Sequence, residues 1–276
     1  MLRSGRIAYT NDLPIYAAFD EGVLRYPGLL RADVPAALNR RLLAGELDLS
    51  PISAFTYAAN AERLVLMPDL CIGSRDMAWS VICVSRRPLA LLDGAVIAVT
   101  AESASGLNLL RLLLERRYRV RASFEVSDDP FAAAREGRPA LLIGDRAIDA
   151  QLFFPAEAVH DLGLLWHEWT GLDMVYALWA ARREVFTAQP GALAAAMRML
   201  KEARAWGMTH IARVIELAQA THPRPTGVYE AYYRTLNFEF DQRARAGFLR
   251  YCEELRAVGI LASLPAVEPE VFVVGC

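Results

Sequence analysis

Polar residues that favour helix N-termini gather at four places where a predicted strand gives way to a predicted helix. These junctions lie at 10–14, 50–53, 100–106 and 144–146. Their Ser, Thr, Asn and Asp side chains can accept hydrogen bonds from free backbone N–H groups, and a proline at a helix start loses no bond. Each junction taken alone is therefore explained by helix capping.

Taken together, the four junctions indicate a binding cleft for an anion. All four are carboxyl ends of strands, which is where open α/β sheets bind their ligands. If they belong to two lobes that face each other, four helix N-termini converge, and their N–H groups and dipoles favour a negative charge. Ser103, Ser105 and Gly106 form the best seat, because glycine lets a ligand approach the backbone and hydroxyls can donate. We expect a small carboxylate; the sequence has no GxGxxG or GxxxxGK[ST] motif for a nucleotide.

The junctions offer hydrogen-bonding groups but no obvious pairing of a nucleophile with a base. The groups are the amide of Asn11, the hydroxyls of Thr10, Ser53, Ser80, Ser103 and Ser105, and the carboxylates of Asp12 and Asp145. Considered alone, these residues favour binding over catalysis, as in a solute-binding protein. Such proteins are usually exported, however, and we expect no export signal here, because the N-terminal residues lack a long apolar run after a basic start.

Strand and helix patterns alternate over the first 155 residues. Strands are predicted at 6–10, 48–53, 79–85, 95–100 and 139–145, and helices at 14–19, 34–47 and 106–118. This order predicts an α/β architecture with right-handed crossovers. From Pro190 onward the pattern is almost wholly helical.

Two apolar runs, 79–85 and 173–180, stand where the pattern changes. We interpret them as two strands that cross between lobes and form a hinge. The first lobe would then comprise 1–85 and 174–276, with a helical C-terminal region, and the inserted second lobe would comprise 86–173. The alternative is a single continuous sheet.

Composition excludes several classes of protein. The 276 residues are 54% hydrophobic with a net charge of −2, which suits one large or two small domains and not a nucleic-acid-binding surface. No apolar run is long enough for a membrane span, so we expect a cytoplasmic protein without a membrane partner. The cysteines (Cys71, Cys83, Cys252 and Cys276) lack CxxC spacing, and we expect reduced thiols. The four histidines lack ligand spacing, so we expect no metal site.

Several stretches together resemble one enzyme family. They are GRIAYTNDLPIY (5–16), LNRRLLAGELDLSPISAFTYA (38–58), LMPDLCIGS (66–74), WSVICVSRRPLALLDGAVIAVTAESASGLNLLRLLLE (79–115), LLIGDRAI (141–148) and WTGLDMVYALW (169–179). In this order they resemble the chorismate dehydratase family of the futalosine route to menaquinone, up to about residue 185. The resemblance implies a fold similar to type II periplasmic binding proteins, with two lobes that are each a mixed sheet flanked by helices.

The resemblance also implies an activity, a hydro-lyase reaction that removes water from chorismate to give 3-[(1-carboxyvinyl)oxy]benzoate. No metal or organic cofactor is implied. The family's catalytic candidates correspond to Asn11 and Ser80. The residues that we expect to bind the substrate are Tyr9, Thr10, Ser53, Thr100, Ser103, Ala104, Ser105, Gly106 and Asp145.

Such chemistry fits a site without an evident base. Loss of the C3 proton and the C4 hydroxyl makes the ring of chorismate aromatic, so the protein must mainly orient the substrate and stabilise the leaving group. The substrate's own enolpyruvyl carboxylate could accept the proton. Asn11 would orient that carboxylate or the leaving hydroxyl, Ser80 would assist departure of the hydroxyl, and the 103–106 helix start would bind the ring carboxylate.

Two residues depart from the usual family pattern. Asp12 replaces a small hydroxyl or apolar residue, and Arg146 replaces an acidic residue. We expect Asp12 to point away from the dianionic substrate as a helix cap, and the alternative is that Asp12 is the general base.

Two other functions stay open. A sister lyase of the same pathway, which forms a naphthoate, should carry a histidine or another base in the cleft. A non-catalytic carboxylate-binding module would bind chorismate without consuming it.

Overall fold

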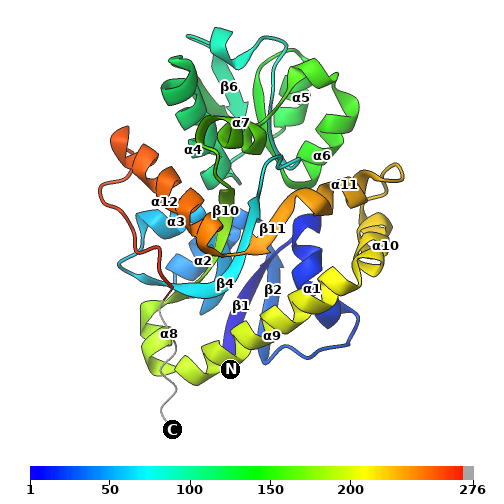
Figure 1. The fold of residues 1–276 in the computed structure, drawn as a ribbon, viewed down its shortest axis with the longest axis vertical. Coiled ribbons are helices and arrows are strands. Elements are labelled where there is room, and N and C mark those ends of the chain that lie inside the picture. The colour runs from blue at the N-terminus through cyan, green and yellow to red at the C-terminus, as the bar shows by residue number, and fades with distance from the viewer. Residues whose placement is uncertain (270–276) are drawn as a thin grey trace.

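The chain folds into two lobes, each built on its own β-sheet (Figure 1). The computed structural model describes residues 1–269, so Cys276 lies outside the described residues. The α/β fold class is confirmed, and the two separate sheets exclude the single continuous sheet.

The first lobe contains a six-stranded sheet in the order β11–β4–β10–β3–β1–β2. Its strands are β1 (Leu2–Ile7), β2 (Gly28–Asp33), β3 (Leu49–Ser53), β4 (Leu64–Ser74), β10 (Met174–Arg182) and β11 (Leu236–Glu239). β1 runs parallel to β2 and β3, whereas β10 runs antiparallel to β3 and β4, and β11 antiparallel to β4. The sheet is therefore mixed, and the carboxyl ends of β1 and β3 share one edge.

The second lobe contains a five-stranded sheet in the order β7–β6–β8–β5–β9. Its strands are β5 (Val81–Val84), β6 (Val96–Val99), β7 (Ser123–Val126), β8 (Ala140–Ile143) and β9 (Val159–Asp161). β6 runs parallel to β7 and β8, and β5 runs antiparallel to β8 and β9. The carboxyl ends of β6 and β8 thus also lie together.

Helices flank both sheets. Before β10 they are α1 (Leu13–Asp20), α2 (Pro35–Leu43), α3 (Ala54–Ala59), α4 (Ala104–Leu112), α5 (Pro130–Arg135), α6 (Gly144–Phe153) and α7 (Leu162–Thr170). The later ones are α8 (Arg183–Ala188), α9 (Pro190–Thr209), α10 (Ile211–Thr221), α11 (Val228–Thr235) and α12 (Gln242–Ala257). Short 3-10 turns lie at η1 (Thr10–Asp12), η2 (Leu89–Leu91) and η4 (Ala156–Ala158), and α4 continues into a π-helical segment, η3 (Leu113–Tyr118).

The interpretation of 79–85 as a strand that crosses between the lobes is wrong. β5 pairs with β8 and β9 inside the second sheet, whereas β10 is an inner strand of the first sheet. All four residues of β5 are buried, and its two neighbours satisfy its backbone without a partner in the first lobe. Segments 75–80 and 162–173 instead connect the strands of the two sheets. The division into 1–85 with 174–276 and 86–173 stays a prediction.

The C-terminal region is less uniformly helical than expected. β11 interrupts the helices and pairs with β4 at the edge of the first sheet, and Figure 1 shows it beside β4. α12 then returns to the second lobe, where its Arg116–Glu254 ion pair with η3 measures 2.9 Å between Nε and Oε2. The Trp166 and Tyr251 rings lie 6.2 Å apart between α7 and α12. α12 therefore packs against η3 and α7 of the second lobe.

Candidate functional site

A cavity lies where the carboxyl ends of β1, β3, β6 and β8 meet. Its empty volume, opening included, is about 610 Å³. It is lined by Ile7, Tyr9, Asn11, Pro35, Ser53, Ile72, Ser80, Val81, Glu102, Ser103, Ala104, Ser105, Gly106, Ile143, Gly144, Tyr176, Ala177 and Leu236. The four junctions of the sequence therefore do converge.

The first junction turns sharply after β1 through η1 and gives the cavity Tyr9 and Asn11. The Asn11 Oδ1 atom is buried and has no hydrogen-bond partner among residues 1–269. A buried polar atom without a partner is costly and is normally satisfied. The Asn11 amide is therefore available to a ligand.

Ser80 reaches the cavity from the link before β5. The residue before it, Trp79, has a φ of 61°, a left-handed conformation that is rare for a bulky side chain. The Asp161 carboxylate at the start of α7 holds this turn by accepting the backbone N–H groups of Ala78 at 2.9 Å and of Trp79 at 2.7 Å. Such strain is found where the surrounding structure fixes a functional residue.

Ser80 itself is 5% exposed. Its hydroxyl donates to Ala78 O at 3.3 Å, a long bond that a better acceptor can replace. Its carbonyl accepts the Gly144 N–H at 2.8 Å, which links the turn to the start of α6.

The start of α4 presents the expected anion seat, with one difference. The Ser103 hydroxyl makes no hydrogen bond to any described residue and faces the cavity. The Ser105 hydroxyl, in contrast, donates to Tyr176 O at 2.8 Å and contacts the Ser53 hydroxyl at 2.8 Å. Ser105 and Ser53 line the cavity, but they join the two lobes there, and the Ser105 proton is not free for a ligand.

Gly106 lines the cavity beside this seat. A Cβ atom at Gly106 would lie 2.5 Å from Ser103 Oγ and 3.0 Å from Val81 Cγ1. A side chain at this position would therefore displace the Ser103 hydroxyl and narrow the approach to the backbone.

Three residues expected at the site do not line the cavity. Thr10 and Asp145 are bonded to each other, with 2.6 Å between Thr10 Oγ1 and Asp145 Oδ1, and both are buried. The Thr100 Oγ1 atom accepts the Glu102 N–H at 3.2 Å and lies on a neighbouring hollow with Asp145. Their polar groups hold the chain rather than face the cavity.

Sequence reasoning missed Glu102 and Tyr176 as lining residues. Glu102 sits among the hydroxyls of its junction, so its position was a usable signal, and its Oε2 atom accepts the Tyr9 hydroxyl across the cleft. Burial, together with the neighbouring Glu102 carboxylate, raises the pKa of Tyr9 above its usual range. Tyr176 lies in the apolar run of β10, where no polar pattern marked it.

Gly144, also missed, carries a positive φ of 59° directly under the Tyr9 ring. A Cβ at Gly144 would lie 2.9 Å from that ring. Glycine is therefore needed here both for the left-handed conformation and for the close approach.

Asp12 is not the helix cap that the sequence predicts. It occupies the N-cap position of α1, but its side chain makes no capping bond, and both carboxyl oxygens are buried without a partner among residues 1–269. Its nearest charge is Arg6, whose Nε lies 4.0 Å from Oδ2. Burial raises the pKa of Asp12 to about 8, against the opposing effect of Arg6. Arg146, the other departure, is exposed and donates to Asp129 at 2.8 Å, outside the cavity.

Within residues 1–269 no group of three or more His, Cys, Asp or Glu side chains is arranged to hold a metal ion. In the same range, no helix has the length and apolarity needed to cross a bilayer.

Solved structures share this fold. A protein from Archaeoglobus fulgidus superposes with a TM-score of 0.73 at 20% identity, covering 94% of this chain and 98% of that one. The periplasmic aliphatic sulphonate-binding protein of Escherichia coli gives a TM-score of 0.66 at 18% identity, covering 98% of this chain and 92% of that one. The two-lobe fold of periplasmic binding proteins, expected from the sequence, is confirmed.

Sequence relatives identify the family. The chorismate dehydratase of Thermus thermophilus is 33% identical over 249 residues, which cover 80% of this chain and 84% of the relative. The 1,4-dihydroxy-6-naphtoate synthase of the same organism is 27% identical over 222 residues, 79% of each chain. The profile of a family described as menaquinone biosynthesis matches residues 2–257. The chain therefore belongs to the menaquinone biosynthesis family.

Proposed function

We propose that this protein is a chorismate dehydratase, a hydro-lyase that removes water from chorismate to give 3-[(1-carboxyvinyl)oxy]benzoate in menaquinone biosynthesis. The observation that carries the proposal is the buried, unpartnered Asn11 amide oxygen in a cavity that also presents the Ser80 and Ser103 hydroxyls. The 33% identity to a chorismate dehydratase supports the choice of substrate.

The reaction breaks the C3–H and C4–O bonds of chorismate. The electron pair of the C3–H bond completes the aromatic ring, and the C4 hydroxyl leaves as water after it receives the proton that came from C3. We propose that the substrate's enolpyruvyl carboxylate takes the C3 proton. The Ser80 hydroxyl then donates to the leaving hydroxyl, where a preorganised hydrogen bond strengthens as charge develops. Asn11 orients that hydroxyl or the enolpyruvyl carboxylate.

The start of α4 is the proposed seat of the ring carboxylate. The free Ser103 hydroxyl and the first N–H groups of the helix supply donors there, and the helix dipole favours the negative charge. Tyr9, Ser53, Ala104, Ser105 and Gly106 complete the proposed contact surface, whereas Thr10, Thr100 and Asp145 support it from behind.

Glu102 is the alternative base, because it is the carboxylate that lines the cavity. Its Oε2 atom is already the acceptor for Tyr9. A Glu102→Gln variant separates the two mechanisms: turnover that survives this change supports proton transfer to the substrate's own carboxylate, and complete loss of kcat with intact binding assigns the base to Glu102.

The function is tested by incubating the protein with chorismate and following the ultraviolet spectrum and the product mass. A product lighter by one water, with an aromatic spectrum, supports the proposal. Tight binding without a change in chorismate would instead establish a carboxylate-binding module. The sister lyase is less well supported, because the naphthoate-forming relative is 27% identical to this chain, against 33% for the chorismate dehydratase. No histidine is among the cavity-lining residues in the part of the chain that the structure describes, which leaves Glu102 as the base that such a lyase would use.

The same proposal places the protein in the cytoplasm. The three described cysteines, Cys71, Cys83 and Cys252, are free and buried, as is usual in a reducing compartment. Burial raises the pKa of the Cys83 thiol to about 12, which makes it unreactive.

A further inference from the structure

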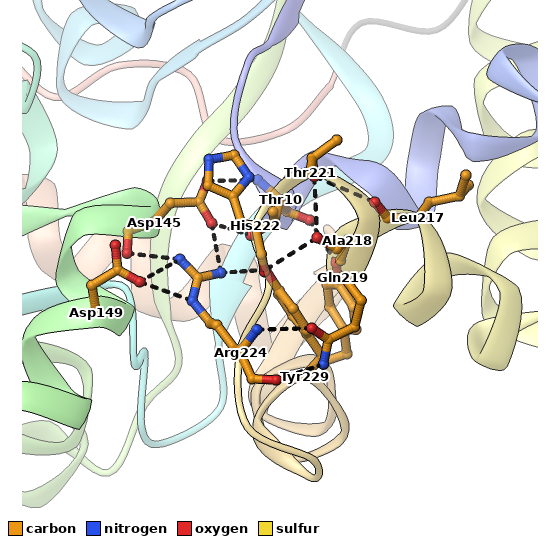
Figure 2. Close-up of polar contacts among 11 residues, drawn as sticks. Thr10, Asp145, Asp149, Leu217, Ala218, Gln219, Thr221, His222, Arg224 and Tyr229 are labelled. Carbon is orange, nitrogen blue, oxygen red and sulfur yellow. Dashed lines mark hydrogen bonds and ion pairs between the residues drawn. The ribbon is translucent and has the colours of Figure 1, made fainter.

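A buried arginine joins the two lobes on the side away from α12. Arg224 lies in the loop between α10 and α11, which Figure 1 shows near α6 of the second lobe, and Figure 2 shows its side chain beside Asp145 and Asp149. Its side chain is 2% exposed, and the guanidinium lies between the Asp145 and Asp149 carboxylates of α6. Neither sequence motif nor cavity marks this residue.

All five N–H groups of the Arg224 guanidinium are used. Nη1 donates to Asp145 Oδ1 at 3.0 Å and to the Tyr229 hydroxyl, and Nη2 donates to the Asp145 carbonyl at 3.0 Å. Nε and Nη2 both donate to Asp149 Oδ1, at 3.0 and 2.9 Å. Only a planar guanidinium can satisfy this set of acceptors, since lysine has three donors on one point charge.

Residues of the first lobe also hold the loop between α10 and α11 in place, independently of its contacts with α6. The Arg224 backbone exchanges two hydrogen bonds with the Gln219 side chain on α10, at 2.8 and 3.0 Å. The Tyr229 hydroxyl on α11 donates to His222 O at 2.8 Å (Figure 2). Arg224 is thus a preorganised first-lobe group aimed at the second lobe.

The hydrogen bonds that start at Arg224 lead through Asp145 to Thr10, the residue before Asn11. Asp145 Oδ1, which accepts from Arg224, also accepts from Thr10 Oγ1 at 2.6 Å, and Asp145 Oδ2 accepts the Thr10 N–H at 3.1 Å. The Thr10 carbonyl accepts the Tyr233 hydroxyl of α11 at 2.9 Å. Every polar group of Thr10 is therefore fixed by Asp145 or Tyr233, while the next side chain, Asn11, faces the cavity with its oxygen unpartnered.

We propose that Arg224 is a positioning residue: it joins the lobes through Asp145 and Asp149 and, through Asp145 and Thr10, places the Asn11 amide. Lobe closure and assembly of the site are then one event, because the Asp145 carboxylate that meets Arg224 also aligns Thr10. The part that concerns turnover rests on the proposed function, whereas the part that concerns closure does not.

The test is a double-mutant cycle on chorismate turnover with Arg224→Lys and Thr10→Val. Arg224→Lys keeps the positive charge but loses the planar guanidinium with its five N–H donors. Thr10→Val keeps the shape of the side chain but loses the Oγ1 donor. We expect each to lower kcat about 10²-fold with a smaller change in KM, as a small misplacement of a catalytic group does. The kcat of the double variant should be no lower than that of the more impaired single variant, because both substitutions act through the same turn at Thr10 and Asn11. The proposal would be overturned if the fold-losses of kcat in the two single variants multiplied in the double variant, or if the kcat of Arg224→Lys equalled that of the wild type.

Arg213→Lys is the matched control. Arg213 also forms a forked pair, with Glu21 at 2.7 Å, but it is exposed on α10 and lies outside the cavity. Its replacement should leave kcat and KM unchanged. Thermal midpoints of all variants show whether each is folded.

Small-angle X-ray scattering of the ligand-free chain measures how closely the two lobes meet without any substrate. We expect a larger radius of gyration for Arg224→Lys than for the wild type or Arg213→Lys, and equal radii would overturn the inference. A wild type that leaves chorismate unchanged would reject the proposed function alone, and scattering would still decide the role of Arg224.

Discussion

Asn11 and Ser80 differ from their neighbours because one has an unpartnered buried oxygen and the other a long, replaceable bond. We predict that Asn11→Ala and Ser80→Ala each lower kcat on chorismate about 10²–10³-fold, the usual cost of losing one preorganised hydrogen-bonding group at the reacting atoms. KM should change less, because bonds that strengthen as the hydroxyl leaves act on the transition state. Steady-state kinetics checks this, with Asn60→Ala and the exposed Ser123→Ala as controls.

Asp12 offers a second prediction, on pH and stability. Burial raises the pKa of Asp12 from 3.8 to about 8 in the folded chain. Between these values the folded state holds a proton that the unfolded state has released, so the free energy of unfolding falls as the pH rises. We predict that Asp12→Asn becomes progressively more stable relative to the wild type from about pH 4 to about pH 8.

Urea unfolding at several pH values measures this difference, and other titrating groups cancel in the comparison. A stability difference independent of pH would contradict the raised pKa. A carboxyl that stays protonated near neutral pH is also a poor general base, so we expect Asp12→Asn to keep most of the turnover. An inactive Asp12→Asn beside active Asn11→Ala and Ser80→Ala would instead make Asp12 the base.

Residue types and their order predicted which junctions meet and most of the residues that line the cavity, but not which of the polar groups there turn away from it. Thr10 and Asp145 carry the right groups, yet their mutual bonds turn them away from the cavity. Asp12 matched the capping pattern, yet its side chain lies in the interior. Such choices depend on contacts between residues far apart in the chain, which local propensity does not contain.

At the scale of elements, the first turn of α4 lies so close to Ser103 and to Val81 of β5 that a side chain at Gly106 would disturb it. The Cβ of a Gly106→Ala variant would meet Ser103 Oγ at 2.5 Å and displace this hydroxyl. Loss of one hydrogen bond to a charged group costs about 1.5–3 kcal/mol, so we predict a KM for chorismate roughly 10- to 100-fold higher. Gly191→Ala, in α9 with nothing within 4 Å of the new Cβ, is the control. An unchanged KM in a folded Gly106→Ala variant would show that Ser103 binds no substrate carboxylate.

Elements with a strong local pattern were predicted well, and those defined by distant partners were not. The expected strands at 95–100 and 139–145 correspond to β6 and β8, and the expected 106–118 helix to α4 and η3. β4 was missed because Pro68 and Asp69, the latter with a φ of 71°, interrupt its apolar run at a register shift. β11 has four residues and pairs only with β4, so nothing near it in the sequence marks it as a strand.

At the scale of the whole molecule, the alternation of strands and helices was enough to predict two lobes and a cleft. It did not predict how closely the lobes meet. The pairs Tyr9 with Glu102, Ser53 with Ser105, and Arg224 with Asp145 all join the first lobe to the second. Each pair joins residues that are separated by dozens of positions in the chain, so the closed arrangement follows from tertiary structure alone.

The cooperative boundary between the lobes gives a last prediction. The original division assigns 81–85 to the first lobe, whereas β5 hydrogen-bonds only within the second sheet. Native-state hydrogen exchange in low denaturant separates these assignments, because amides of one cooperative unit open together. We expect the β5 amides to open with those of β6 and β8, at a free energy different from that of β1, β3 and β10. Opening of β5 together with β10 would restore the boundary at residue 85.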